Sequence, residues 1–373
     1  MDKIIPDFNL TLTNMILNGF ELDPNYYECP ANISERPPSV RRPYWGIWFF
    51  ASGVVMLISF EGTEMIELKV KVYDELLLER LRQGCATAGR SILIRLLYIP
   101  CFFAIVFSPL LKTPAYKTML VLAIYDISSI FIHSISTGIL GFYGVPFCDY
   151  PRLIACLGGV ALGSWMGCCI ASMTLAVIRI CDLSMQMNIK KYFDGARIYI
   201  FLGAFFVYGV GAGLLTKPVI FTPTYMSWFF DPMVGKNPEF YVNLPHTYNN
   251  ILMAICTLAF YGFLSYLGFK AGDGNTSNNS NTRKVVILLQ SFFFCIFHTI
   301  ASVLYAYMQF IAAPPYLILV SQIAWQTSSG SVCIVYLTLN KTIRKSVMKM
   351  VCPKAYLYGR RVSMMISMNS NSA

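Results

Sequence analysis

Long stretches without a charged side chain constrain the fold of this chain more than any other feature. Residues 285–340 form an uncharged run of 56 residues, and residues 153–178 form another of 26 that ends at Arg179. A helix rises about 1.5 Å per residue, so about 20 apolar residues cross a hydrocarbon core of roughly 30 Å. A protein that crosses the membrane several times explains such runs, and a soluble domain does not.

Composition excludes several other classes of protein. Charged residues make up 13% of the chain, against roughly 25% in soluble domains. The net charge of +10 comes from basic residues in short loops and in the tail, so we do not expect a nucleic-acid partner. Most cysteines lie inside apolar runs, and the three histidines lack metal-ligand spacing. The sequence therefore predicts no metal and no cofactor.

The apolar segments predict seven membrane spans, the first of which is interrupted. Its two parts, 43–60 and 96–111, are each short for a spanning helix, and the intervening residues 59–95 are rich in charge. This atypical segment is either a true looped-out insertion or the product of a misjoined gene model, and the sequence leaves both open. The other six spans are predicted at 118–140, 153–180, 198–216, 247–269, 285–311 and 316–339.

The distribution of lysine and arginine predicts the orientation. Sixteen of these residues lie on one side of the bundle, in alternate loops and the tail, whereas the opposite loops after the second span hold three. Because positive residues favour the cytoplasmic side, we expect the amino terminus outside and the tail inside. The predicted organisation is an extracellular segment at 1–43 without a cleavable signal peptide, a membrane domain at 44–340 and a basic cytoplasmic tail at 341–373.

Local motifs add a family resemblance. The chain resembles the nematode serpentine receptors of class T over about residues 96–350. The motifs that carry the likeness are LLYIPC (96–101), LAVIRICDL (175–183), WFFDP (228–232), LPHTYNN (244–250), YAYMQF (305–310), IAWQTSSG (323–330) and IVYLTLNKTIR (334–344).

The resemblance implies an all-α, seven-transmembrane helix bundle with the architecture of rhodopsin-like G protein-coupled receptors. It also implies a chemosensory receptor at the plasma membrane, with an external small-molecule ligand and a heterotrimeric G protein as partners. A multi-pass transporter or channel is the alternative, although the sequence shows neither a continuous polar pathway nor inverted repeats. No enzymatic site is visible.

The inner face contains the candidate coupling residues. Arg179 ends the third span as the arginine of the Asp-Arg-Tyr motif does in rhodopsin-like receptors, although Ile178 and Ile180 flank it here. A switch role implies pairing in the inactive state and contact with the G protein in the active state; a purely topological role is the alternative. The other candidates on this face are Lys190, Lys191, Tyr336 and Arg344, together with Cys352 as a palmitoylation site on an amphipathic, membrane-associated tail helix.

One carboxylate lies inside a predicted span. Asp126 is in the middle of the second span, where an ionised carboxylate is costly, so we expect it to face the bundle interior. Its LAIYD context is similar to that of the sodium-site aspartate of rhodopsin-like receptors. A hydrogen-bonded packing residue is the alternative, and the absence of an Asn-Pro pair in the seventh span weakens the sodium interpretation.

The outer face contains three further predictions. Trp228, Phe229, Phe230 and Tyr241 form either an apolar lid over a ligand pocket or an interfacial aromatic belt. Cys29 and Cys148 are both predicted outside and are a candidate disulfide. Asn9 and Asn32 lie in glycosylation sequons, whereas the sequons in the 270–284 loop face the cytoplasm and should stay unmodified.

Overall fold

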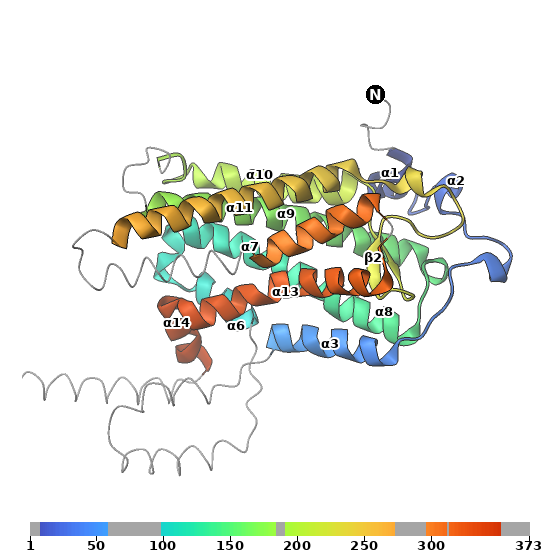
Figure 1. Cartoon of the computed structure of the whole chain (residues 1–373), viewed down its shortest axis with the longest axis horizontal. Coiled ribbons are helices and arrows are strands. Elements are labelled where there is room, and N and C mark those ends of the chain that lie inside the picture. The colour runs from blue at the N-terminus through green and yellow to red at the C-terminus, as the bar shows by residue number, and fades with distance from the viewer. Residues whose placement is uncertain (1–7, 59–97, 184–190, 273–295, 312, 352–373) are drawn as a thin grey trace, which may run out of the picture.

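The chain forms an elongated bundle of helices around one central helix (Figure 1). The computed structural model describes residues 8–58, 98–183, 191–272, 296–311 and 313–351. The central helix is α9 (Pro151–Leu183), which packs against α7 (Pro114–Ile130), α10 (Ile198–Leu215) and α11 (Leu244–Gly272).

The remaining elements surround this centre. The other bundle elements are α3 (Pro43–Ile58), α6 (Tyr98–Val106), the π-helical turn η4 (Phe131–Ser136), α8 (Thr137–Tyr143), the helical segment 296–310, α13 (Pro315–Leu339) and α14 (Lys341–Val351). Outside the bundle lie η1 (Phe8–Leu10), α1 (Leu12–Leu17), α2 (Pro24–Tyr27), η2 (Ile33–Glu35), η3 (Pro109–Lys112), η5 (Phe147–Asp149), β1 (Ile220–Thr222), β2 (Ser227–Phe229) and η7 (Pro238–Tyr241).

The helix lengths agree with a membrane-spanning chain. Among the described residues, three helical runs are long and apolar enough to cross a bilayer: Pro114–Tyr143, Pro151–Asp182 and Ile198–Leu215. The second predicted span is longer than expected because its helix begins at Pro114, and proline suits the first helical position. Residues 59–95, on which the sequence left two explanations open, fall outside the described residues, as does the start of the span predicted at 285–311.

Glycines allow α9 and α10 to approach backbone to backbone. A Cβ added at Gly163 would lie 2.6 Å from the carbonyl oxygen of Gly209, and one at Gly213 would lie 2.6 Å from that of Gly159. Lipid supplies no hydrophobic drive for helix association, so small residues that permit close van der Waals contact are favoured at such interfaces. The glycines of the third span therefore serve the packing of α9 against α10.

The outer end of the bundle is covered by two segments that lie outside the predicted spans. The connection after α10 folds into an antiparallel hairpin in which Phe221 pairs with Trp228. The amino-terminal segment packs beside it, with Leu10, Met15 and Tyr27 almost fully buried. The hairpin, α1 and α2 lie together at the right-hand end of Figure 1.

The opposite end is organised by α14. The predicted amphipathic tail helix is present, and it packs against α6 at the left of Figure 1. Its Ile343 and Val347 are buried in a core cluster with Ala104 and Ile105 of α6. Part of the apolar face that we expected to lie on the membrane surface is therefore covered by the bundle itself.

Candidate functional site

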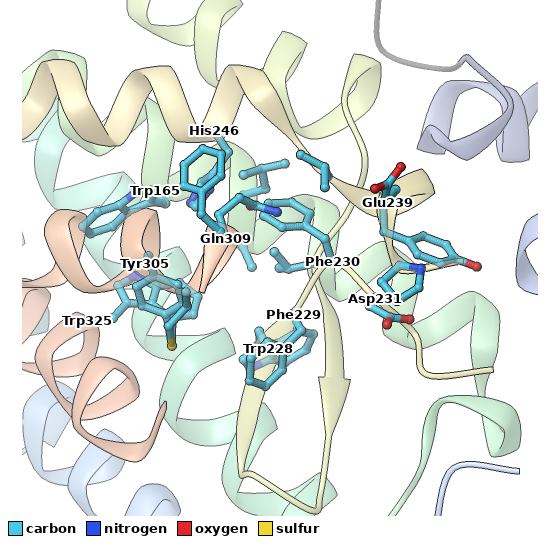
Figure 2. A pocket seen from close by; sticks show the side chains of 18 residues that line it. Trp165, Trp228, Phe229, Phe230, Asp231, Glu239, His246, Tyr305, Gln309 and Trp325 are labelled. Atoms are coloured by element: carbon cyan, nitrogen blue, oxygen red, sulfur yellow. The ribbon is translucent and has the colours of Figure 1, made fainter. Parts of the chain in front are cut away.

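A cavity of about 440 Å³ lies between the outer ends of α9, α11, segment 296–310 and α13, under the 217–243 connection (Figure 2). Its size falls within the usual range of small-ligand sites, roughly 300–1,000 Å³. The lining is mainly apolar and aromatic: Ala161, Leu162, Trp165, Val219, Trp228, Phe229, Phe230, Asp231, Pro238, Glu239, Tyr241, Val242, His246, Tyr305, Met308, Gln309, Phe310 and Trp325.

All four predicted lid residues line this cavity. Trp228, Phe230 and Tyr241 are at most 9% exposed, and Phe229 is half-buried. Residues of an interfacial belt present their rings to lipid headgroups, whereas these rings pack inward. The arrangement is that of an aromatic roof over the cavity.

Hydrogen bonds hold the roof to the helices below. Trp228 Nε1 donates to Thr137 Oγ1 at 2.8 Å, and the neighbouring Ser227 hydroxyl donates to Gln322 Oε1 of α13 at 3.2 Å. Tyr305 from segment 296–310 donates to the same Gln322 oxygen at 3.0 Å. The roof, the cavity wall and α13 are thus joined through one glutamine.

The π-helical turn η4 provides a further anchor for this glutamine. A π turn leaves a backbone carbonyl without its usual α-helical partner, and such turns recur at functional sites. Gln322 Nε2 donates to the His133 carbonyl oxygen at 3.1 Å, and Gln326 Nε2 donates to Ser134 Oγ at 2.7 Å and Ser52 Oγ at 2.6 Å. Residues of α3, η4, segment 296–310 and α13 therefore meet in a buried polar layer beneath the cavity.

A second cluster of polar side chains lies beneath Trp165 of the cavity wall. The Trp165 indole stacks on His298, with ring centroids 5.9 Å apart and planes 11° from parallel. His298 Nε2 lies 3.5 Å from Cys168 Sγ, which in turn lies 3.6 Å from Asp126 Oδ1. Asp126 is fully buried and faces the bundle interior. Within the described residues, no three His, Cys, Asp or Glu side chains are grouped so as to hold a metal ion.

Two acidic side chains line the outer part of the cavity. Burial raises the pKa of Asp231 above its ordinary value, and the Met233 N–H, which donates to Asp231 Oδ1 at 2.7 Å, partly opposes this shift. Glu239 lies in the η7 turn near the aromatic roof. No lysine or arginine is among the described residues that line the cavity.

The predicted inner-face residues are separated from the cavity by most of the bundle. Arg179 is half-buried near the inner end of α9, and its guanidinium donates to Met119 Sδ of α7 at 3.6 Å. Among the described residues it pairs with no carboxylate. Lys191 is exposed, and Arg344 donates to the Leu337 carbonyl oxygen at 3.5 Å. Lys190, Cys352 and the side chain of Tyr336 lie outside the described residues.

The extracellular predictions fall at the cavity end. Cys29 and Cys148 form a disulfide that joins the amino-terminal segment to the loop after α8. Asn9 and Asn32 are both exposed, as a glycosylated side chain must be. The sequons of the 270–284 loop lie outside the described residues.

Among the cavity residues that sequence reasoning did not single out are His246, Tyr305 and Trp325. The histidines were dismissed because they lack metal-ligand spacing, yet His246 is the first of a polar set with Asn249 and Asn250. The spacing i, i+3 and i+4 places such a set on one face of a helix. This signal was available within the LPHTYNN motif.

Comparisons with known proteins identify the family of this chain. A family model described as the serpentine type 7TM GPCR chemoreceptor Srt matches residues 69–359, so the match begins inside the charged segment. Serpentine receptor class T-55 of Caenorhabditis elegans is 25% identical over 242 residues, which cover 64% of this chain and 66% of that protein, slightly less than two thirds of its length. The predicted resemblance and the seven-helix fold class are confirmed: the chain belongs to the serpentine class T chemoreceptors, a family of seven-transmembrane receptors of the G protein-coupled type.

Proposed function

We propose that this chain is a chemosensory receptor of the plasma membrane that binds an external small molecule in the outer cavity and couples binding to a heterotrimeric G protein. The observation that carries the proposal is the cavity itself, which has the size of a ligand site and an aromatic roof on one side. The cavity end also contains the Cys29–Cys148 disulfide, and disulfides persist in oxidising compartments such as the cell exterior. This supports an amino terminus outside.

The lining favours a small and largely apolar ligand. Tryptophan, tyrosine and phenylalanine rings dominate the walls, so removal of apolar ligand surface from water supplies most of the binding free energy. A few polar groups at fixed positions then select among apolar molecules.

In this proposal, ligand binding changes the inner face through the two clusters of buried polar side chains beneath the cavity. Trp165 contacts His298, and Tyr305 contacts Gln322, so a ligand that changes the position of either aromatic ring changes hydrogen bonds that join several helices. A ligand shifts a two-state bundle only by its difference in affinity for the two states. In this proposal, the two arrangements of the polar groups define those states.

The inner face supplies the coupling surface. Arg179 lies half-buried against α7, where a change in helix packing exposes or covers its guanidinium. Lys190, Lys191, Tyr336 and Arg344 complete the proposed contact with the G protein. Cys352 is the proposed site of a lipid anchor that holds the tail at the bilayer.

The test is ligand-dependent nucleotide exchange. Purified receptor in lipid nanodiscs is mixed with heterotrimeric G proteins and a panel of small apolar molecules, and GTP-analogue uptake is measured. In parallel, the same molecules are tested for transport into receptor-containing vesicles. Stimulated exchange without flux supports the receptor. Flux of a bound molecule without any stimulation of exchange would instead support the transporter alternative.

A further inference from the structure

Two residues that line the cavity each carry a buried N–H donor without a hydrogen-bond partner. Among the described residues, His246 Nδ1 and Trp325 Nε1 have no acceptor, although each residue is only 5% exposed. Buried polar groups in native proteins are nearly always satisfied, so each exception needs an explanation. Figure 2 shows both side chains at the cavity, and the Tyr305 ring contacts each of them, with centroid distances of 6.4 Å to His246 and 6.0 Å to Trp325.

The protonation of His246 follows from its neighbours. Trp165 Nε1 can only donate, and it donates to Asn250 Oδ1 at 2.8 Å. This fixes the orientation of the Asn250 amide, so that its Nδ2 group faces His246 Nε2 at 3.1 Å. An amide nitrogen also only donates, which makes Nε2 the acceptor of a neutral imidazole. The proton is therefore on Nδ1, so the unpartnered Nδ1 atom of this cavity residue is a hydrogen-bond donor.

The Asn250 orientation has a second support. Asn249 Nδ2 also donates to Asn250 Oδ1, at 3.4 Å, and the Tyr208 hydroxyl fixes Asn249 by donating to its Oδ1 at 3.0 Å. A reversed Asn250 amide would place its NH₂ group against two donors. The hydrogen-bond chain from Tyr208 to His246 thus permits one tautomer.

Trp325 differs from the other tryptophans of the cavity. Trp165 and Trp228 also line it, but their Nε1 groups donate to Asn250 Oδ1 and Thr137 Oγ1 at 2.8 Å each. The Trp325 ring packs against the rings of His133 and Tyr305, with centroid distances of 5.1 Å and 6.0 Å. Its own N–H has no acceptor among the described residues. Its buried donor is as unsatisfied as that of His246.

The charges of the lining residues restrict the chemical class of the ligand further. A carboxylate ligand would need a cation beside it, and no described lining residue is lysine or arginine. An ammonium ligand would place its N–H groups against the N–H groups of His246 and Trp325, which repel a cation. The outer acids do not reverse this, since Asp231 is already engaged by the Met233 N–H, and Figure 2 shows Asp231 and Glu239 at the end of the cavity away from His246 and Trp325.

We propose that the cavity selects an uncharged, largely apolar molecule with hydrogen-bond acceptors, such as a ketone, ester, ether or heteroaromatic nitrogen, that receives the N–H groups of His246 and Trp325. This rests on the proposed receptor function, because it identifies the chemical class of that receptor's ligand. The apolar walls supply affinity, and the two donors discriminate between molecules of equal shape.

The ligand-independent test uses Trp325→Phe, with Trp228→Phe as the matched control. Both variants replace an indole by a phenyl ring in the same cavity, but only Trp228 loses a hydrogen bond that the protein makes. Thermal unfolding of the purified receptor without ligand should show a lowered midpoint for Trp228→Phe and an unchanged or raised midpoint for Trp325→Phe. A lowering of similar size in both variants would overturn the proposal, because it would show that the Trp325 donor has a partner.

The ligand test compares molecules that share a carbon skeleton. Benzophenone is paired with diphenylmethane and 2-undecanone with undecane, and the corresponding amines and carboxylates complete each set. Stabilisation against heat, measured over a concentration series, reports binding without any G protein. We expect the ketones to bind more tightly than the other members, and Trp325→Phe to reduce this preference roughly fivefold to tenfold, the value of about one net hydrogen bond. Trp228→Phe should retain the preference.

Two results would overturn the proposal: a preference for the hydrocarbon, amine or carboxylate members, or an equal loss of ketone and hydrocarbon binding in Trp325→Phe. Nucleotide exchange measured on the same samples separates this inference from the proposed function. Ketone-selective binding without stimulated exchange would refute the receptor function and leave the ligand class standing. Exchange stimulated equally by ketone and hydrocarbon would do the reverse.

His246 is the less suitable residue for the first test. Its removal would leave Asn250 Nδ2 without an acceptor as well, so a loss of stability would not report on the cavity alone.

Discussion

Replacing Gly163 with alanine would place a methyl group directly against the backbone of α10. The added Cβ would lie 2.6 Å from the Gly209 carbonyl oxygen and 3.5 Å from Gly213 Cα. Close carbon–oxygen contacts in proteins are about 3.3 Å or longer, so the two helices must separate by roughly 0.7 Å at this point. The partner atom is backbone rather than a flexible side-chain end, so no local rotation can relieve the contact.

The expected loss is about 1–3 kcal/mol, which is the usual cost of overpacking a well-packed interior. Gly211→Ala is the matched control on the partner helix, because a Cβ there meets no atom within 4 Å. Alanine also favours helix relative to glycine by up to about 1 kcal/mol, so the control should be neutral or slightly stabilising. The assay is the thermal unfolding midpoint of each purified variant in lipid nanodiscs.

The same change should reach the cavity. Ala161, Leu162 and Trp165 of α9 line it, and Gly163 lies among them. Gly163→Ala should therefore weaken ligand-stimulated exchange in addition to lowering stability. If Gly163→Ala proves as stable as Gly211→Ala, the backbone contact between α9 and α10 does not exist as described, and the explanation of the glycines is wrong.

Three further predictions concern the two ends of the molecule. Arg179→Ala should reduce ligand-stimulated nucleotide exchange without reducing surface expression, and unchanged exchange would return Arg179 to a purely topological role. Burial raises the folded-state pKa of Asp231, so the receptor should lose stability as the pH rises from the ordinary aspartate value, about 3.9, through that raised value. Asp231→Asn should remove this dependence in thermal unfolding curves recorded across pH, and a wild-type slope of opposite sign would contradict the shift. Glycan mapping should find sugar on Asn9 or Asn32 and none in the 270–284 loop; the reverse pattern would invert the topology.

The spans could be predicted because a helix that crosses a bilayer needs a continuous apolar segment of about 20 residues. A run without charge, ended by Arg179 or interrupted by proline, is recognisable without any knowledge of its neighbours. The roof could be predicted only as one of two alternatives, since the aromatic residues of the 217–243 connection also suit an interfacial belt. Its hairpin was missed because strands of three residues, Ile220–Thr222 and Ser227–Phe229, are too short to show alternation.

The partners inside the bundle could not be predicted in this way. Hydropathy indicates that Asp126 must face inward, but it does not indicate that Cys168 of α9 contacts Asp126 or that His298 of a third helix contacts Cys168. Which residues meet depends on the rotation and crossing of each helix, and these are set by packing rather than by local sequence. The orphan donors of His246 and Trp325 belong to the same category, since only the assembled neighbours show which hydrogen bonds remain unmade.

The amino-terminal segment was predicted only as an extracellular region. Leu10, Met15 and Tyr27 are too widely spaced to indicate a periodic apolar face, yet all three are buried against the outer core. Their burial becomes possible because the Cys29–Cys148 disulfide and the hairpin bring the segment onto the end of the bundle. Long-range covalent and packing constraints of this kind have no local signature.

The most direct test of the central claim is agonist-stimulated nucleotide exchange by a receptor whose cavity has been filled. Ala161→Phe places a ring in the cavity from α9, and the adjacent Val160→Phe is the control, since Val160 is 50% exposed and does not line the cavity. With an agonist identified on the wild-type receptor, Val160→Phe should keep the wild-type dose–response curve. Ala161→Phe should require at least roughly tenfold more agonist, a loss of about 1.4 kcal/mol of binding, while its basal exchange is retained. A wild-type response from Ala161→Phe would show that the ligand acts elsewhere and would contradict the account.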